Sequence, residues 1–171
     1  MILRKLKEIN RDQKGFNMIE LTLAILVTGI ISTGIVTTIF QTFEVNDSIT
    51  NRKVAIGDVE SAIFWLSGDA QVAQDINTSP GPDFLYLSWV EWDNTVHQVT
   101  YTIVGTEMLR YYTVTGGSST NTTVAYFIDP SQTSCNFTDY ILHFTATSTV
   151  GSFRPVTETR ISRVFPRSYL R

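Results

Sequence analysis

An uncharged run of 23 residues, Leu21–Phe43, constrains this chain more than any other feature of its sequence. At about 1.5 Å per residue, a helix of that length crosses the hydrocarbon core of a bilayer, which is about 30 Å thick. Basic residues mark the cytoplasmic side of a membrane helix. Five of them precede the run: Arg4, Lys5, Lys7, Arg11 and Lys14. The sequence therefore predicts a single-pass helix with its N-terminus inside and the remaining chain outside.

A single carboxylate, Glu20, stands directly before the uncharged run. A charged side chain at membrane depth is costly unless it is paired, so such a residue marks a functional site. The alternative is an interfacial position near the helix N-terminus, where the helix dipole favours negative charge. On these features alone, an uncleaved signal anchor that holds an unrelated domain is the simpler interpretation.

A set of three consecutive residues before Glu20 completes a recognisable pattern. Lys14, Gly15 and Phe16 are followed by three residues and then by Glu20. Together with the apolar run, this pattern resembles the processing site of type IV prepilins and type II secretion pseudopilins. The resemblance covers the first quarter of the chain. It implies that a membrane aspartic peptidase cuts between Gly15 and Phe16 and then methylates the Phe16 nitrogen, giving N-methylphenylalanine, and that Glu20 is an assembly contact.

The same resemblance implies a structural subunit, a minor pilin or pseudopilin, of a type IV pilus or a type II secretion pseudopilus. Its implied partners are the prepilin peptidase/methyltransferase, other pilins or pseudopilins, and the cytoplasmic (inner) membrane that holds the chain before assembly. Leu66, Asp69 and Ala73 also match a spacing at the helix end of J-type and W-type minor subunits. The alternative function is a binding module at a filament tip, either an adhesin or a DNA-uptake pilin.

Charge and cysteine content narrow these possibilities. The segment Met1–Gly15 carries five basic and two acidic residues, so its removal changes the formal net charge from −3 to −6. An acidic chain is poorly suited to bind phosphates, and no nucleic acid partner is expected. Cys135 is the single cysteine, which excludes an intramolecular disulfide. Many major pilins have such a disulfide, so its absence favours a low-copy subunit.

Four arginines near the end of the chain support the same expectation. A cluster of like charges is better suited to a few specific contacts with acidic neighbours than to a uniform lattice of identical subunits. Alternatively, they only solvate an edge strand and prevent unwanted pairing. They are Arg160, Arg163, Arg167 and Arg171.

The pattern divides the chain into four parts. Residues 1–15 form a leader, 16–43 the membrane and assembly half of a helix, 44–79 its amphipathic half, and 80–171 a β-sheet head. The helix is expected to run from about Phe16 to about Ile76, because no proline interrupts it before Pro80. Steps of three and four residues mark its apolar face. The positions on that face are Val45, Ile49, Ile56, Val59, Ile63, Leu66, Ala70 and Ala73.

After Pro82 the hydrophobic period becomes two, which is typical of strands. The predicted strands are Phe84–Val90, Val96–Val104, Met108–Thr115, Val124–Ile128, a strand around Tyr140–Ala146, and Thr157–Phe165. Residues 116–121 and 130–136 are predicted to be loops. Strands joined by short turns imply one antiparallel meander, and one of its faces is expected to pack on the helix. The predicted fold class is therefore α+β and pilin-like.

Catalytic and metal-binding signatures are not evident in this sequence. It contains no HExxH, GxSxG, P-loop or GxGxxG motif, so no enzyme activity, catalytic residue, metal or cofactor is expected. His97 and His143 fall in strand patterns and are expected to be half-exposed structural residues. Cys135 lacks an activating neighbour in the sequence and is expected to be inert.

Overall fold

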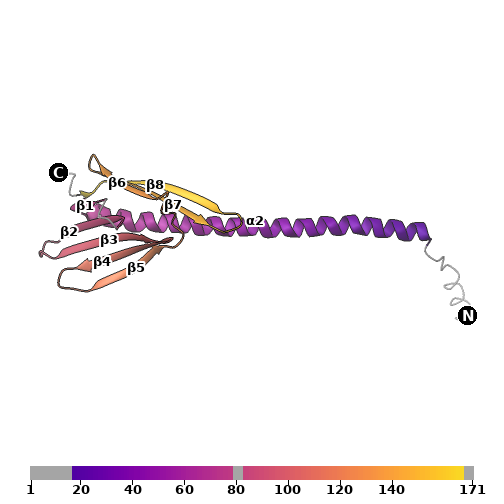
Figure 1. Cartoon of the computed structure of the whole chain (residues 1–171), viewed down its shortest axis with the longest axis horizontal. Helices are drawn as coiled ribbons and strands as arrows, with labels where there is room; N and C mark the ends of the chain where they lie inside the picture. The colour runs from indigo at the N-terminus through magenta and orange to yellow at the C-terminus, as the bar shows by residue number, and fades with distance from the viewer. Residues whose placement is uncertain (1–16, 79–82, 168–171) are drawn as a thin grey trace, which may run out of the picture. The chain divides into compact units, whose positions relative to one another are not determined.

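The computed structural model describes residues 17–78 and 83–167 (Figure 1). The chain divides into two compact units, Met1–Asn46 and Asp47–Arg171. One helix, α2 (Met18–Val72), contributes its first part to the first unit and its second part to the second unit. Eight strands follow among the described residues of the second unit, so the fold is α+β, with a long N-terminal helix and antiparallel sheets in a pilin-like arrangement. The predicted fold class is confirmed.

The second part of α2 buries one face against the sheets. The predicted apolar face is confirmed at Val59, Leu66 and Ala70, which are fully buried. It is wrong at Val45 and Ile49, which are 58% and 50% exposed. The difference arises because the buried face of α2 begins only at Ala55. Its members recur every three or four residues and include two carboxylates: Ala55, Asp58, Val59, Ala62, Leu66, Asp69 and Ala70.

The helix ends at Val72, a few residues before the predicted end near Ile76. Ile76 belongs instead to a short strand, β1 (Asp75–Asn77), which pairs antiparallel with β2 (Leu85–Val90). The Gln74 side chain fixes this change of direction, because its amide exchanges two hydrogen bonds with the backbone of Val90 at 3.1 and 3.2 Å. Strand pairing therefore replaces the last helical turn.

The first sheet has five antiparallel strands in the order β1-β2-β3-β4-β5. Beyond β1 and β2 it contains β3 (Val96–Val104), β4 (Glu107–Val114) and β5 (Ser119–Ala125). The prediction for Val96–Val104 is confirmed residue by residue. The tight β3–β4 turn is also confirmed, and Gly105 adopts φ 63°, which glycine accepts without strain. Residues 119–121, predicted as loop, belong to β5 because they pair with β4.

A second sheet of three antiparallel strands replaces the predicted single meander. It has the order β6-β7-β8, with β6 (Ser134–Thr138), β7 (Ile141–Val150) and β8 (Val156–Val164). The sheets separate because the chain after β5 turns to run beside β7. There Thr149 N–H donates to Phe127 O at 2.9 Å and Asp129 N–H donates to Thr147 O at 2.8 Å. The predicted loop 130–136 is wrong for residues 134–136, because they form the start of β6.

Both sheets and the second part of α2 share one hydrophobic core (Figure 1). Alternation along the strands brings Leu87, Tyr101 and Met108 inward from the first sheet, and Leu142 and Phe144 inward from the second. The prediction that Tyr140 shares a face with Leu142 is wrong. Tyr140 lies in the β6–β7 turn, where it is 66% exposed and has φ 62°.

Candidate functional site

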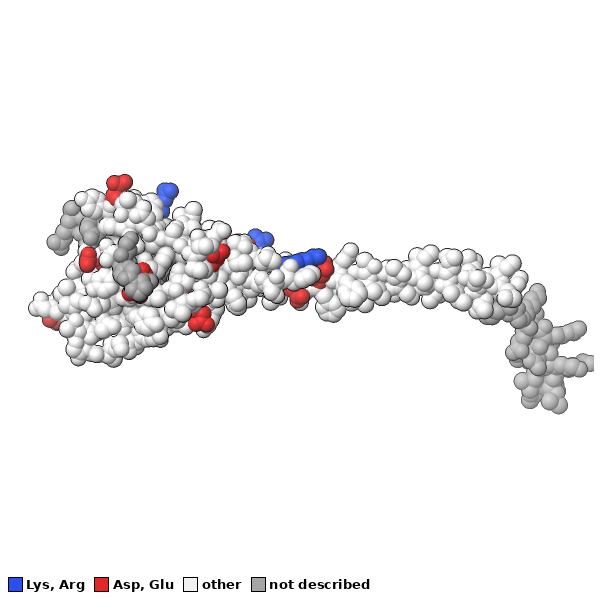
Figure 2. All heavy atoms as spheres, viewed as in Figure 1, with Lys and Arg blue, Asp and Glu red and all other residues white. Residues whose placement is uncertain are grey.

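The first part of α2 exposes an unusually large apolar surface. Every residue from Asn17 to Thr50 is exposed, and the large apolar side chains between Met18 and Phe43 are 46–84% exposed. No Lys, Arg, Asp or Glu interrupts the segment from Leu21 to Phe43 (Figure 2). The helix reaches a mean hydropathy of 2.2 and is long and apolar enough to cross a membrane. An apolar surface of this length is compatible with a membrane span or with a signal-like segment.

Threonine hydroxyls in this segment are satisfied within the helix. Thr28 donates to the Ala24 carbonyl at 2.7 Å, and Thr38 donates to the Gly34 carbonyl at 2.8 Å. Four other threonines make the same bond to the residue four positions earlier: Thr22, Thr33, Thr37 and Thr42. This back-bonding removes the desolvation cost that a free hydroxyl has in an apolar environment.

Glu20 lies in the first turn of α2, as the only acidic residue there. Its side chain is exposed and forms no hydrogen bond or ion pair with another described residue. The helix N-terminus stabilises the negative charge at this position. The described part of the fold therefore makes no use of this carboxylate. Gly15 and Phe16, the expected cleavage residues, lie outside the described residues.

In the second unit, Asp69 is the centre of a buried polar network that joins α2 to the first sheet. Arg110 of β4 donates two hydrogen bonds to it, from Nε at 2.7 Å and from Nη2 at 2.8 Å. The Tyr101 hydroxyl of β3 donates a third at 2.5 Å. Burial, and the adjacent Asp69 carboxylate, raise the pKa of Tyr101. The hydrogen bonds to Asp69 also raise the pKa of Arg110, so both donors keep their protons.

The Arg110 guanidinium contacts two aromatic rings. It lies 5.0 Å from the ring centre of Trp65 and 5.1 Å from that of Tyr112, distances typical of cation–π contacts. Sequence analysis singled out Asp69 but missed Arg110. The alternation of β4 gave a signal for it, because Met108, Arg110 and Tyr112 share one face of the strand.

A second helix carboxylate, Asp58, holds the segment that leaves β5. Its two oxygens accept hydrogen bonds from the backbone N–H groups of Tyr126 at 3.1 Å and Phe127 at 3.3 Å. These bonds satisfy backbone donors that no strand partner reaches. Asp58 and Asp69 therefore attach α2 to both the strands and the connection between the two sheets.

The histidine and cysteine predictions have mixed outcomes. His97 is buried rather than half-exposed: its ring stacks on Trp89, and its Nδ1 lies 2.6 Å from the Tyr112 hydroxyl. His143 is half-buried, as predicted. Burial raises the pKa of the Cys135 thiol to about 12, so it stays protonated at neutral pH. Among residues 17–78 and 83–167, no group of three His, Cys, Asp or Glu side chains is arranged to hold a metal ion.

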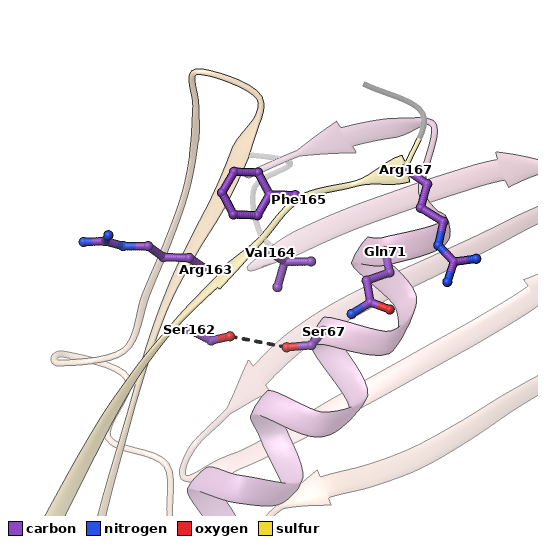
Figure 3. A pocket seen from close by; sticks show the side chains of 7 residues that line it. All are labelled: Ser67, Gln71, Ser162, Arg163, Val164, Phe165 and Arg167. Carbon is purple, nitrogen blue, oxygen red and sulfur yellow. Dashed lines mark hydrogen bonds between the residues drawn. The ribbon is translucent and has the colours of Figure 1, made fainter. Parts of the chain in front are cut away.

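A groove of about 490 Å³ lies between α2 and the C-terminal end of β8 (Figure 3). Its helix side is formed by Ser67 and Gln71, and the Ser67 and Ser162 hydroxyls lie 3.4 Å apart. The strand side contains Val164 and Phe165 together with two arginines, Arg163 and Arg167. In Figure 3 the Ser162 and Val164 side chains point toward the helix, whereas the Arg163 side chain points away from it.

No family model, no curated protein and no solved structure matches this chain.

Proposed function

We propose that this chain is a structural subunit, a pilin or pseudopilin, of a type IV pilus or of a type II secretion pseudopilus. One observation carries the proposal: an exposed, uncharged helix segment with Glu20 at its start continues as the core helix of an α+β head. Lipid satisfies such a surface before assembly, and the helices of neighbouring subunits satisfy it afterwards. A signal anchor for an unrelated domain does not require the head to fold around the same helix.

Processing at the start of the chain is the first step of the proposal. A prepilin peptidase hydrolyses the Gly15–Phe16 peptide bond with water, leaving a carboxylate on Gly15 and an amine on Phe16. The same enzyme then transfers a methyl group to that amine from a sulfonium methyl donor, which leaves as a thioether while the amine loses a proton. The cut lies on the basic side of the apolar segment, so the helix stays in the membrane. The proposed location is the cytoplasmic (inner) membrane, with the head outside.

Co-expression of the full chain with a prepilin peptidase tests the proposal. N-terminal sequencing and intact mass measurement of the membrane-extracted protein should show a chain that begins at methylated Phe16. Gly15→Leu should block the cut, because the peptidase must approach the backbone closely. Gly29→Leu is the matched control and should be cut normally, since a side chain at Gly29 meets no atom within 4 Å. A chain that still begins at Met1, or begins beyond Phe43, would falsify the proposal.

We further propose a low copy number. The support is the single cysteine, which leaves the head without the disulfide that stabilises many major subunits by about 2–4 kcal/mol. Quantitative mass spectrometry of sheared filaments measures the ratio of this chain to the other subunits. A ratio that makes it the most abundant component would refute the low-copy proposal and leave the subunit proposal intact.

A further inference from the structure

Strand β8 forms one edge of the second sheet, because it pairs only with β7 among the described strands. It spans nine residues, and two apolar side chains at its C-terminal end, Ile161 and Phe165, are 70% and 54% exposed. An exposed edge strand is a template for pairing with another chain, so folded proteins usually cover it or charge it. The length of β8 and its apolar end therefore mark it as a pairing site.

The backbone hydrogen bonds of β7 show how its residues alternate. Thr149 N–H donates to Phe127 O at 2.9 Å, and Asp129 N–H donates to Thr147 O at 2.8 Å. Because β8 occupies one edge of β7, Phe127 and Asp129 lie at the other edge. The odd-numbered residues of β7 therefore direct their N–H and C=O groups away from β8.

The same alternation identifies the unpaired backbone groups of β8. Thr145 lies opposite Ile161, and His143 lies opposite Arg163. In such a pair of an antiparallel ladder, both residues direct their backbone groups away from each other. The N–H and C=O groups of Ile161 and Arg163 therefore point away from β7, and no other backbone group of the described residues bonds to them. We call this side of β8 the free edge.

The even-numbered side chains of β8 face α2. Arg52 Nε donates to Glu158 at 2.8 Å, and the Ser67 and Ser162 hydroxyls lie 3.4 Å apart, so α2 and β8 run in the same direction. Near Ser162 the groove of about 490 Å³ separates the end of β8 from the helix. Figure 3 shows the Ser162 side chain turned towards the helix and the Arg163 side chain turned away from it. A further extended segment beside the free edge can therefore place alternate side chains in this groove.

We infer that an extended segment of a different subunit adds to the free edge as an additional strand of the second sheet. In this mode of recognition, main-chain hydrogen bonds supply affinity and alternate side chains supply specificity. On the outer face, an apolar side chain of the segment contacts Ile161 and a carboxylate pairs with Arg163. Arg163 is exposed and forms no ion pair with another described residue. Its charge deters segments that lack the carboxylate and selects those that have one.

A second copy of this chain does not fit the free edge. Two β8 strands related by a two-fold axis pair antiparallel, which would turn the two α2 helices in opposite directions, whereas subunits anchored in one membrane share one direction. Any other segment of a second copy would make a head-to-tail contact, which repeats into an array and requires many copies. The inference rests on the proposed function, which supplies different subunits at high effective concentration.

Hydrogen exchange resolved to single amides tests the inference. The full-length chain in detergent micelles is compared with the same chain in sheared filaments. The N–H groups of Ile161 and Arg163 should exchange rapidly in micelles and about tenfold or more slowly in filaments, because strand addition protects them. The N–H group of Ser162 is the matched internal control, since it bonds to β7 and should be protected in both states.

Photo-cross-linking identifies the occupant. A benzophenone amino acid in place of Phe165, irradiated in cells that assemble the filament, should join this chain to a different subunit cut by the same peptidase. The same amino acid in place of Phe153, which is 91% exposed in the β7–β8 turn, is the control and should not give that product.

A proline at the free edge gives a further measurement. Ile161→Pro removes one unpaired N–H group without breaking a bond to β7, and should lower the cross-link yield about two- to tenfold, the range for one lost hydrogen bond. Ile161→Thr keeps the N–H group and should lower the yield less. An unchanged exchange rate at Ser162 shows that the sheet still folds in both variants.

Three results would overturn the inference: equally fast exchange of Ile161 and Arg163 in micelles and filaments, a cross-link from position 165 only to a second copy, or equal yields for Ile161→Pro and Ile161→Thr. In each case, a chain that is processed to Phe16 and present in filaments leaves the proposed function standing. A chain that is never processed contradicts the proposed function, and the inference with it.

Discussion

Asp69 of α2 and Arg110 of β4 form a two-point ion pair in which both side chains are almost buried, with 12% and 11% of their surface exposed. The two residues are far apart in sequence, so the pair connects the helix to the first sheet. Tyr101 completes the set of donors to Asp69. Three hydrogen bonds therefore converge on one carboxylate.

Asp69→Ala should lower the free energy of unfolding of the head by about 3–5 kcal/mol, because it leaves the Arg110 charge buried without a partner. Guanidinium titration of the full chain in detergent micelles measures this change. Asp75→Ala removes an exposed carboxylate just beyond the helix and should change the value by no more than about 0.5 kcal/mol. Equal effects of the two substitutions would show that the ion pair does not stabilise the fold.

Cys135 should report on opening of the head. Burial raises the pKa of its thiol to about 12, so iodoacetamide at pH 8.5 should label the folded chain far more slowly than the chain in guanidinium. An equal labelling rate in both states would contradict the partly buried position of this thiol.

The same shift predicts the direction of a pH dependence. The pKa of Cys135 is raised from an ordinary value of about 8.5. Its stabilising contribution is therefore complete below about pH 8.5 and decreases as the pH rises towards 12. Tyr101 acts in the same direction above about pH 10, because its pKa is also raised. The free energy of unfolding should fall above pH 9, and less steeply in Cys135→Ala; a constant value up to pH 12 would show that neither shift exists.

Sequence periodicity was sufficient for the class of fold and for the strands with the clearest alternation. Val96–Val104 alternates strictly, and its predicted bounds are confirmed. The strand around Tyr140–Ala146 was identified by Leu142, Phe144 and Ala146, all fully buried. The uncharged run predicted the exposed apolar part of α2 for the same reason: local composition alone determines it.

Features that depend on distant partners could not be predicted. The separation into two sheets follows from hydrogen bonds between Phe127–Asp129 and β7, which are not encoded in either segment alone. Predicting that Arg110 is the partner of Asp69 would have required knowing which strand packs over the last turns of α2. β1 was missed because Asp75–Asn77 is polar and short, and only its pairing with β2 makes it a strand.

Gly57→Ala should stabilise the head by about 0.5–1 kcal/mol. Gly57 is exposed on α2, and a methyl group placed there meets no atom within 4 Å. Alanine loses less backbone freedom than glycine when a helix forms. Gly151→Ala is the contrasting control and should destabilise, because Gly151 has φ 99° and an added methyl carbon would lie 2.7 Å from the Asn51 amide nitrogen. A loss of stability in Gly57→Ala would indicate a requirement for glycine that the packing does not explain.

Substitution of Glu20 tests the part of the proposed function that concerns assembly. Cleavage creates a positive charge at Phe16, and in a filament the Glu20 carboxylate of one copy can pair with the Phe16 amine of its neighbour. Two unit charges 4 Å apart attract by about 4 kcal/mol at an effective dielectric of 20, before desolvation is subtracted. Because Glu20 has no partner among the described residues of its own chain, its removal should leave folding unchanged.

Glu20→Ala should therefore be inserted and cut at Phe16 like the unmodified chain, but should enter sheared filaments at a strongly reduced level. Immunoblotting of the sheared and membrane fractions measures both quantities in one experiment. Glu44→Ala, which removes a carboxylate at the other end of the apolar segment, serves as the matched control and should be incorporated normally. If Glu20→Ala enters filaments as well as Glu44→Ala does, the carboxylate is not a subunit contact, and its position in the first turn of α2 reflects only the favourable field of the helix N-terminus.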